Sequence, residues 1–316
     1  MKRFIAAALA VAALASPVAA QGVTSAYWRH EEGTGGALIP AGPDTVLDSS
    51  GNGNHMQTFN PTFTSATYTN MVSPLALRSG LPNTLSLDFG PGGDDAGLND
   101  DNFTTNAKSI SSQLFSAMTV EVAFRMDNVA GYQAILGKDG KPLGDAAGED
   151  DSPVPPFKVL VRGDDFPGGV PNQLFIEWID GDGTLNSDVH FLASGETVAP
   201  NQWYHVAVTI DANNASLWVA GENSPYQLKD AISGDFAGTA GNVLVDEPLG
   251  WSIGRGMFNN GVADWSDAKI DEVRISSAVL SPDEFLFVAV PEPATLSLVA
   301  VGLLAACGLR RRGVSG

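Results

Sequence analysis

The chain of 316 residues contains a single cysteine, Cys307, and only 17 Lys plus Arg against 36 Asp plus Glu. One cysteine cannot form an internal disulfide, and it cannot complete a Cys-x-x-Cys redox or zinc motif. The net charge of −19 leaves no basic face to neutralise phosphates, so the composition excludes nucleic-acid binding. The hydrophobic content of 44% is nevertheless high enough to bury a core, so we expect a folded domain.

Residues 1–20 have the layout of a secretory signal. Lys2 and Arg3 precede an apolar run over residues 4–14, and small residues follow up to Ala20. Cleavage after Ala20 satisfies the small-residue rule, and the apolar run is well short of the ~20 residues that a membrane-spanning helix needs. We therefore predict a signal peptide at 1–20, followed by a domain at 21–288.

A second apolar stretch lies at the C-terminus, in residues 289–316. Pro291 and Pro293 prevent a helix from continuing into this stretch, so a helix can begin only at about Ala294 and must end by Leu309. Such a helix rises ~24 Å, against a hydrocarbon core of ~30 Å, which predicts a short transmembrane helix. The arginines that follow it favour a cytoplasmic C-terminus, with the preceding domain on the opposite side of the membrane.

This C-terminal pattern resembles the PEP-CTERM sorting tail of Gram-negative bacteria. The resemblance implies export, transient retention in the inner membrane and processing by an exosortase-type enzyme, after which the protein reaches the cell surface or the extracellular exopolysaccharide. An ordinary C-terminal membrane anchor is the alternative. Because Cys307 lies in the tail, the domain has no cysteine and cannot be a thiol enzyme. The motif residues are Val290, Pro291, Glu292, Pro293, Arg310, Arg311 and Arg312.

Apolar and polar residues alternate repeatedly between the two ends. The clearest alternation runs over residues 118–126 and predicts a half-buried strand. Ser281 and Pro282 form the only convincing helix start. Many short strands without a long repeat predict one all-β domain, an antiparallel two-sheet sandwich or jelly roll. The other expected strands cover residues 84–89, 157–162, 173–179, 189–193, 203–210, 216–220, 251–254 and 270–276.

Several short motifs in this domain resemble the concanavalin A-like, LamG-type jelly roll. They occur in the expected order and span residues 26–287, although long acidic insertions at 91–102 and 139–156 depart from the pattern. The resemblance implies two curved sheets, a concave face or rim loops that carry a ligand, and frequently a calcium ion. The motifs lie at residues 27–33, 47–55, 85–89, 119–125, 203–208 and 270–284.

A glycoside hydrolase on this scaffold would need paired carboxylates. Glu177 and Asp180 fall on opposite faces of an expected strand, and so do Asp271 and Glu272. The four histidines are dispersed, and no Gly-x-Ser-x-Gly elbow occurs. We therefore predict no catalytic residues.

Trp265 is the best candidate for stacking on a sugar ring, because it lies in a polar loop. The other five tryptophans lie in expected strands and are predicted to be in the core. Acidic clusters at residues 94–101, 145–151 and 180–188 offer oxygen ligands for Ca²⁺, although such runs are more often solvated turns.

Asp271 is the candidate calcium ligand. By strand alternation it shares a face with Val273 and Ile275. If that face is buried, the carboxylate needs compensation, either from backbone N–H donors or from a metal ion. The LamG-type resemblance implies Ca²⁺ at this position, with Asp48 in the first loop as a second ligand.

The sequence as a whole favours an exported, non-enzymatic surface or extracellular-matrix protein that binds glycan or acts in adhesion. A polysaccharide hydrolase or lyase on the same scaffold is one alternative, and an inert structural surface component is another.

Overall fold

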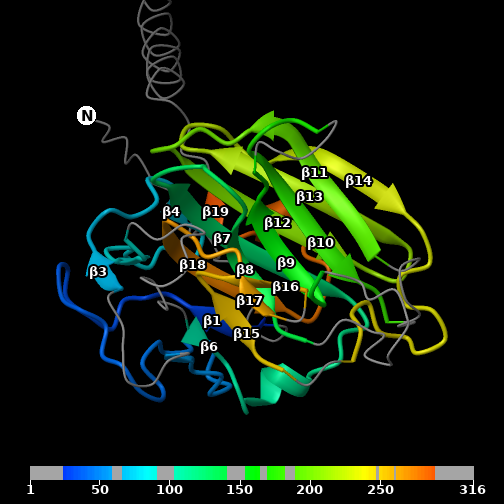
Figure 1. The fold of residues 1–316 in the computed structure, drawn as a ribbon, viewed down its shortest axis with the longest axis horizontal. Helices are drawn as coiled ribbons and strands as arrows, with labels where there is room; N and C mark the ends of the chain where they lie inside the picture. Colours follow the sequence, from blue (N-terminus) through cyan, green and yellow to red (C-terminus); the bar gives the residue numbers. More distant parts are fainter. Residues whose placement is uncertain are drawn as a thin grey trace, which may run out of the picture.

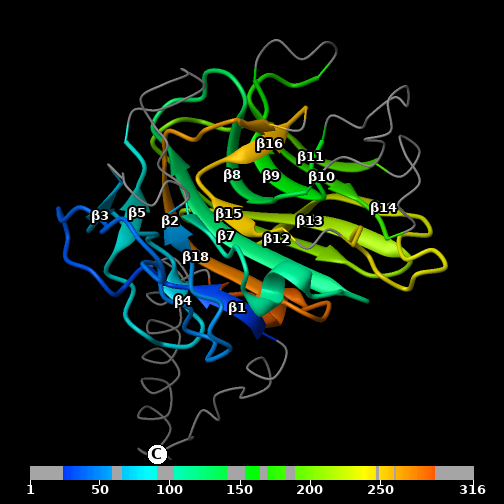
Figure 2. The same cartoon turned by 60° about the horizontal axis from the view of Figure 1, so that its bottom comes forward.

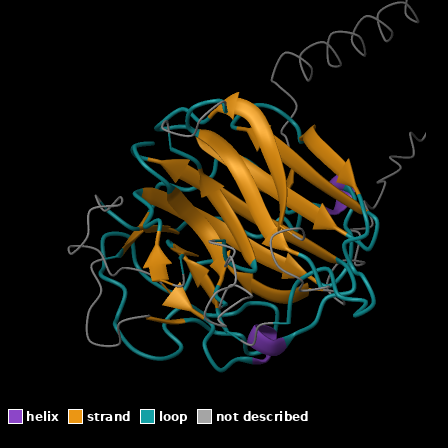
Figure 3. Cartoon of the chain, turned by 45° about the vertical axis from the view of Figure 1, so that its right-hand side comes forward, coloured by secondary structure: helices purple, strands orange, loops and turns teal. Residues whose placement is uncertain are grey.

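The computed structural model describes residues 24–58, 66–90, 103–140, 154–163, 169–181, 189–246, 249–259 and 261–288. The predicted signal peptide, the sorting tail and most of the acidic clusters lie outside these residues. Within them the chain is a sandwich of antiparallel sheets, and the helical structure consists of two 3-10 turns, η2 (Ser109–Ser112) and η3 (Pro282–Glu284) (Figure 3). None of the helices in these ranges is long and apolar enough to span a membrane.

One sheet has eight strands and forms one layer of the sandwich (Figure 1). Its long central strands are β12 and β7, which pair along their whole length. The strand β1 (Thr24–Trp28) is attached to β18 at one side. Apart from β1, the strands follow one another across the sheet in the order β14 (Gln227–Ser233), β13 (Asn214–Gly221), β12 (Trp203–Ile210), β7 (Met118–Met126), β18 (Ala268–Ser276), β5 (Ser86–Asp88) and β3 (Thr67–Thr69).

The second sheet has seven strands and forms the other layer. Two small two-stranded ladders lie outside the two large sheets. One is the hairpin of β16 (Gly256–Phe258) with β17 (Gly261–Ala263), and the other pairs β4 (Ala76–Leu77) with β19 (Phe287–Val288), which are far apart in the sequence. The order in the seven-stranded sheet is β11 (Val189–Thr197), β10 (Gln173–Ile179), β9 (Phe157–Val161), β8 (Gln133–Lys138), β15 (Trp251–Ile253), β6 (Phe103–Thr104) and β2 (Gln57–Thr58).

The main core lies between the two sheets. Alternate residues of β7, such as Val120 and Phe124, pack there against Ile176 and Trp178 of β10. This arrangement confirms the predicted two-sheet antiparallel sandwich, in which each strand directs every second side chain inward.

The outer face of the eight-stranded sheet is also buried, which corrects the prediction of a half-buried strand at 118–126. Thr119, Glu121 and Ala123 of β7 point away from the core and are still inaccessible to solvent. The reason is that the C-terminal segment, residues 280–288, and residues 73–78 lie over this face and form apolar clusters with it.

A β-bulge in β18 changes the faces that alternation predicts for residues 270–276. The register shifts between Asp271 and Arg274, and Glu272 has a φ of 39°. Ile270 and Val273 therefore both face the core, while Asp271 lies opposite Ala123 on the outer face of the sheet. The prediction that Asp271 shares a face with Val273 is wrong because the sequence gives no sign of this extra residue.

Candidate functional site

An aromatic cluster lies on the outer face of the seven-stranded sheet. Because Ile176 and Trp178 of β10 point into the core, Phe175 points outward, where it packs with Leu160 of β9. We call the outward-facing residues Tyr132, Ala134, Leu160, Arg162, Phe175, Phe191 and Ala193 the aromatic face.

The aromatic face contains one ring that is accessible to solvent, Phe191, next to a buried ring, Phe175. The ring centroids of Phe175 and Phe191 are 5.3 Å apart, and the guanidinium of Arg162 lies 4.2 Å from the centroid of Phe175. Phe191 is 44% exposed although it belongs to strand β11, while Phe175 on the neighbouring strand β10 is buried. Aromatic rings held on strands in this way can stack against a planar or ring-shaped ligand.

A buried ion-pair network borders the aromatic face. Lys158 Nζ lies 2.7 Å from Asp264 Oδ2 and 3.3 Å from Glu177 Oε2, and the second contact lacks hydrogen-bond geometry. Burial disfavours the ammonium, but the Glu177 and Asp264 carboxylates outweigh it and raise the pKa of Lys158. The three residues are only 2%, 5% and 8% exposed for Lys158, Glu177 and Asp264.

This network holds the β16–β17 hairpin against the sheet. Lys158 Nζ donates to the carbonyl of Met257 in β16, and Ala134 of β8 donates its N–H to the carbonyl of Asp264, 2.7 Å away. Figure 2 shows β16 beside β8, in agreement with these contacts. The hairpin therefore forms one border of the aromatic face.

Trp265 follows Asp264 directly and is half-buried at this border. The hydrogen bond from Ala134 to Asp264 places its backbone beside β8. The other five tryptophans all lie in strands, as predicted; Trp28, Trp178, Trp203 and Trp251 are buried, and Trp218 is half-buried against Phe285.

Asp48 closes the loop that follows β1. Its Oδ1 accepts N–H donors from Tyr27 and Ser50, and its Oδ2 accepts the N–H of Asn54 and the hydroxyl of Ser50, all at 2.8–2.9 Å. Four donors saturate a carboxylate. The structure thus gives Asp48 a loop-forming role, and its loop pairs with β1 rather than with the strand that carries Asp271.

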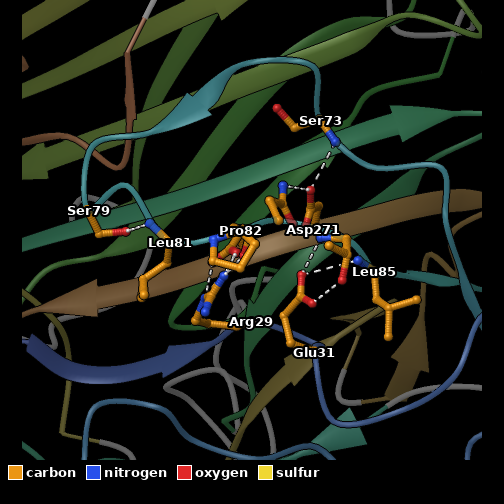
Figure 4. Close-up of polar contacts among 11 residues, drawn as sticks. Arg29, Glu31, Ser73, Ser79, Leu81, Pro82, Leu85 and Asp271 are labelled. Atoms are coloured by element: carbon orange, nitrogen blue, oxygen red, sulfur yellow. Dashed lines mark hydrogen bonds and ion pairs between the residues drawn. The ribbon is translucent and has the colours of Figure 1, made fainter.

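Asp271 lies in a different, incompletely paired environment (Figure 4). Its Oδ2 accepts the N–H of Ser73 at 3.0 Å and the side-chain amide of Asn83 at 2.7 Å. Its Oδ1 is buried without a partner, and so is Oδ1 of Asn83. Burial, followed by the charge of Glu272, raises the pKa of Asp271 to about 8.

Further carboxylates surround Asp271. Glu31 accepts the N–H groups of Thr84 and Leu85 at 2.6 and 3.1 Å, and Glu272 forms an ion pair with Arg29 at 3.1 Å. Burial raises the pKa of Glu272 to about 7 despite that partner, and the charge of Glu31 adds to the effect. Of these three carboxylates, Glu272 is the one that is paired with the Arg29 guanidinium.

Two unpartnered oxygens at Asp271 are of the type that a hard cation takes as ligands. Ca²⁺ prefers carboxylate and amide oxygens, and the two unpartnered oxygens belong to an Asp and an Asn. Across the described ranges, no three His, Cys, Asp or Glu side chains are grouped so that they could hold a metal ion. A cation at Asp271 would therefore need the Asn83 amide oxygen or backbone carbonyls as additional ligands.

A serine–histidine pair that sequence reasoning missed lies next to Asp271. Ser73 Oγ donates to His205 Nε2 at 2.5 Å, because Nδ1 of the ring faces the carbonyl of Ala220 and must carry the proton. Burial lowers the pKa of His205 to about 4. Both side chains are buried, so the pair is sealed from any substrate.

The fold and the sorting tail agree with known families. Residues 95–285 match the concanavalin A-like lectin/glucanases superfamily. The chain belongs to this superfamily. Residues 289–312 match the PEP-CTERM protein-sorting motif, which indicates an exported protein that is sorted to the cell surface of Gram-negative bacteria after processing by an exosortase-type enzyme. No curated protein matches the chain.

Three solved structures illustrate the similarity. The binding domain of botulinum neurotoxin DC in complex with SialylT has 10% identity and a TM-score of 0.45; the match covers 84% of this chain, which spans half (50%) of that one. Domain 4 of AbnA, a GH43 extracellular arabinanase from Geobacillus stearothermophilus, in complex with arabinotriose, has 12% identity and a TM-score of 0.47. The match covers 83% of this chain and 96% of that one. The CBM40 of the Ruminococcus gnavus IT-sialidase bound to alpha2,3 sialyllactose has 15% identity and a TM-score of 0.40. The match covers 63% of this chain and 92% of that one.

Proposed function

We propose that this protein is a non-enzymatic surface protein that binds polysaccharide through the aromatic face. The observation that carries the proposal is the Phe191 ring, which is 44% exposed and packs beside Phe175, whose ring also contacts the Arg162 guanidinium. A solvent-accessible aromatic ring held on a regular strand next to further aromatic side chains can stack on a sugar ring. Trp265, half-buried beside β8, is the proposed second stacking residue.

The proposed location of this activity is the cell surface or the extracellular exopolysaccharide. The sorting-motif match supports export, and the apolar segment between the Pro-Glu-Pro motif and the arginines supports transient insertion into the inner membrane before processing. The net charge of −19 suits a protein that stays soluble after release.

We also propose that Ca²⁺ stabilises the folded domain at Asp271. The unpartnered oxygens of Asp271 and Asn83 support this site, together with the excess of carboxylates over cations around them. Asn83 takes the place of Asp48 in the proposal, because all four acceptor positions of Asp48 are already used. The ion would neutralise a buried carboxylate and hold the segments around Ser73 and Asn83 against β18.

A polysaccharide hydrolase is the second candidate, and one observation favours it. Glu177 and Asp264 lie close enough to contact the same Lys158 ammonium, and paired carboxylates are what glycoside hydrolysis needs. Against this candidate, all three groups are buried, and the ammonium stands between the two carboxylates where a glycosidic bond would have to enter. The network is better suited to fixing the β16–β17 hairpin.

A glycan array combined with a reducing-sugar assay on the surface-extracted protein distinguishes the three functions. Binding without release of sugar ends is the expected result. Turnover that disappears in Glu177→Gln would establish the hydrolase instead. An array without any bound glycan would favour the inert structural component.

A further inference from the structure

The folded domain and the sorting motif are almost contiguous. Strand β19 ends at Val288, and the motif match begins at residue 289. Only Ala289 and Val290 separate β19 from Pro291 of the Pro-Glu-Pro sequence. An extended chain spans at most ~3.5 Å per residue, so while β19 is in place the chain that joins Val288 to Pro291 can reach at most roughly 10 Å.

β19 is held on the outer face of the eight-stranded sheet. It pairs with β4, with Phe287 opposite Leu77 and Val288 opposite Ala76. The ring of Phe287 is 1% exposed and lies 4.5 Å from the ring of His205, in a cluster with Trp203. Figure 1 shows β4 and β19 next to each other, behind the long strands.

The chain before β19 is held by hydrogen bonds with side chains of other segments. Arg78 donates to the carbonyls of Phe285 and Pro282, and Arg274 donates to the carbonyl of Glu284. The N–H of Leu286 donates to Glu121 Oε1 at 2.6 Å. β19 itself is a two-residue ladder outside the large sheets. If the segment opens, the break therefore falls between Leu286 and Phe287.

An enzyme that cuts a peptide chain takes up several residues on each side of the cut in an extended form. A folded surface within ~10 Å of Pro291 obstructs that binding. We propose that β19 must detach from β4 before the exosortase-type enzyme can process the tail, so that this short pairing controls the rate of processing. The inference rests on the sorting motif and the position of β19, and it is independent of glycan binding.

The test is an engineered disulfide that locks β19 to β4 and that reduction reverses. Ala76 and Val288 are directly opposite, and opposed Cα atoms in antiparallel strands are ~4.5–5.5 Å apart, which is within the range that a disulfide bridges. The variant combines Ala76→Cys with Val288→Cys in a Cys307→Ala background, so that no third thiol interferes. An exported protein meets the oxidising conditions in which this disulfide forms. The controls are the background alone and the background with Ala76→Cys alone.

Tail removal is followed by pulse-chase and intact-mass analysis in a Gram-negative host that processes PEP-CTERM proteins. We expect processing of the locked variant to be at least 10-fold slower than in both controls. A six-residue Gly-Ser spacer inserted after Val288 should restore the rate in the locked variant, because it supplies the reach that detachment otherwise provides.

The remaining outcomes overturn the proposal. A locked variant that is processed at the control rate shows that β19 need not detach. A slow locked variant that the spacer does not rescue shows that the lock acts by another route. A background chain that is never processed contradicts the sorting assignment as well, whereas its glycan binding would be unaffected.

Discussion

The two outer faces of the sandwich differ in what covers them. The face of the eight-stranded sheet lies beneath residues 73–78 and 280–288, and its charged groups, such as Glu121 and Arg274, are almost completely buried. Among the residues that the structure describes, the face of the seven-stranded sheet is bordered by the β16–β17 hairpin, and Phe191 is exposed there. We call the first the covered face and the second the open face. Buried polar groups on the covered face hold the overlying segments in place, whereas Phe191 on the open face keeps part of its ring accessible to solvent.

The largest expected loss of stability comes from breaking an ion pair on the covered face. Arg274 Nε lies 2.6 Å from Glu121 Oε2, and both residues are buried. Arg274→Met leaves the carboxylate without its charge partner and should reduce the free energy of unfolding by ~3–5 kcal/mol in urea titrations. Lys229→Met, which removes the surface pair with the exposed Glu196, is the control and should cost at most ~1 kcal/mol. Equal losses in the two variants would contradict the distinction.

Protonation of His205 should weaken the covered face, and comparison with a His205 variant separates this contribution from those of Asp271 and Glu272, whose raised pKa values act in the opposite direction. Burial lowers its pKa from 6.5 to about 4, so the folded state prefers the neutral ring. The stabilisation is therefore present above pH 6.5 and is lost as the pH falls from 6.5 towards 4, by ~3 kcal/mol. His205→Gln should be less stable than the parent at pH 7 and should lose this part of the pH dependence. Stability curves that stay parallel between pH 7 and 4 would refute this prediction.

Calcium should stabilise the same side of the molecule. Binding only to the folded state adds ~2.7 kcal/mol when free Ca²⁺ is 100 times the dissociation constant. The thermal unfolding midpoint should be higher in millimolar Ca²⁺ than in excess chelator, and Asp271→Asn or Asn83→Ala should abolish the difference. Asp48→Asn should lower the midpoint in both buffers and keep the difference. If Asp48→Asn abolished the calcium effect, Asp48 would be a ligand after all.

Truncation of an aromatic side chain on the open face should have little effect on stability. Phe191→Ala removes a ring that is already 44% exposed, so we expect a loss of less than ~1 kcal/mol in the free energy of unfolding. The matched substitution on the covered face, Phe287→Ala, removes a ring that is 1% exposed and should cost ~3–5 kcal/mol. Denaturant titration of the two variants side by side checks whether the faces differ as described.

Three of the long strands could be predicted from the sequence. The bounds of β7, β10 and β12 agree with the predicted strands at 118–126, 173–179 and 203–210 because each is a long run of β-forming residues. β8 was not predicted, since Ala134, Ile135 and Leu136 are all buried and the segment does not alternate. β14 was missed for the opposite reason, because most of it faces solvent on both sides.

The site depends on pairings that a single sequence does not reveal. Phe175 and Phe191 meet only because β10 and β11 are neighbours in this register, with Glu177 opposite Phe191. Likewise, Asp271 faces outward only because of the bulge at Glu272. Asp271 was predicted to be a buried carboxylate because of its apolar neighbours in the strand. The structure does bury it, but on the outer face of the sheet rather than on the face that Val273 occupies. Trp265 and Ca²⁺ binding stay predictions.

The central claim is that the open face binds polysaccharide, and calorimetric titration of a glycan identified on the array tests it most directly. The full-length surface-extracted protein is compared with Phe191→Ala and with Val279→Ala, an exposed apolar residue that precedes the C-terminal segment. We predict that Phe191→Ala weakens binding at least 10-fold while Val279→Ala leaves the dissociation constant unchanged. Equal affinity of the parent and Phe191→Ala would contradict the account, because the exposed ring would then have no part in ligand recognition.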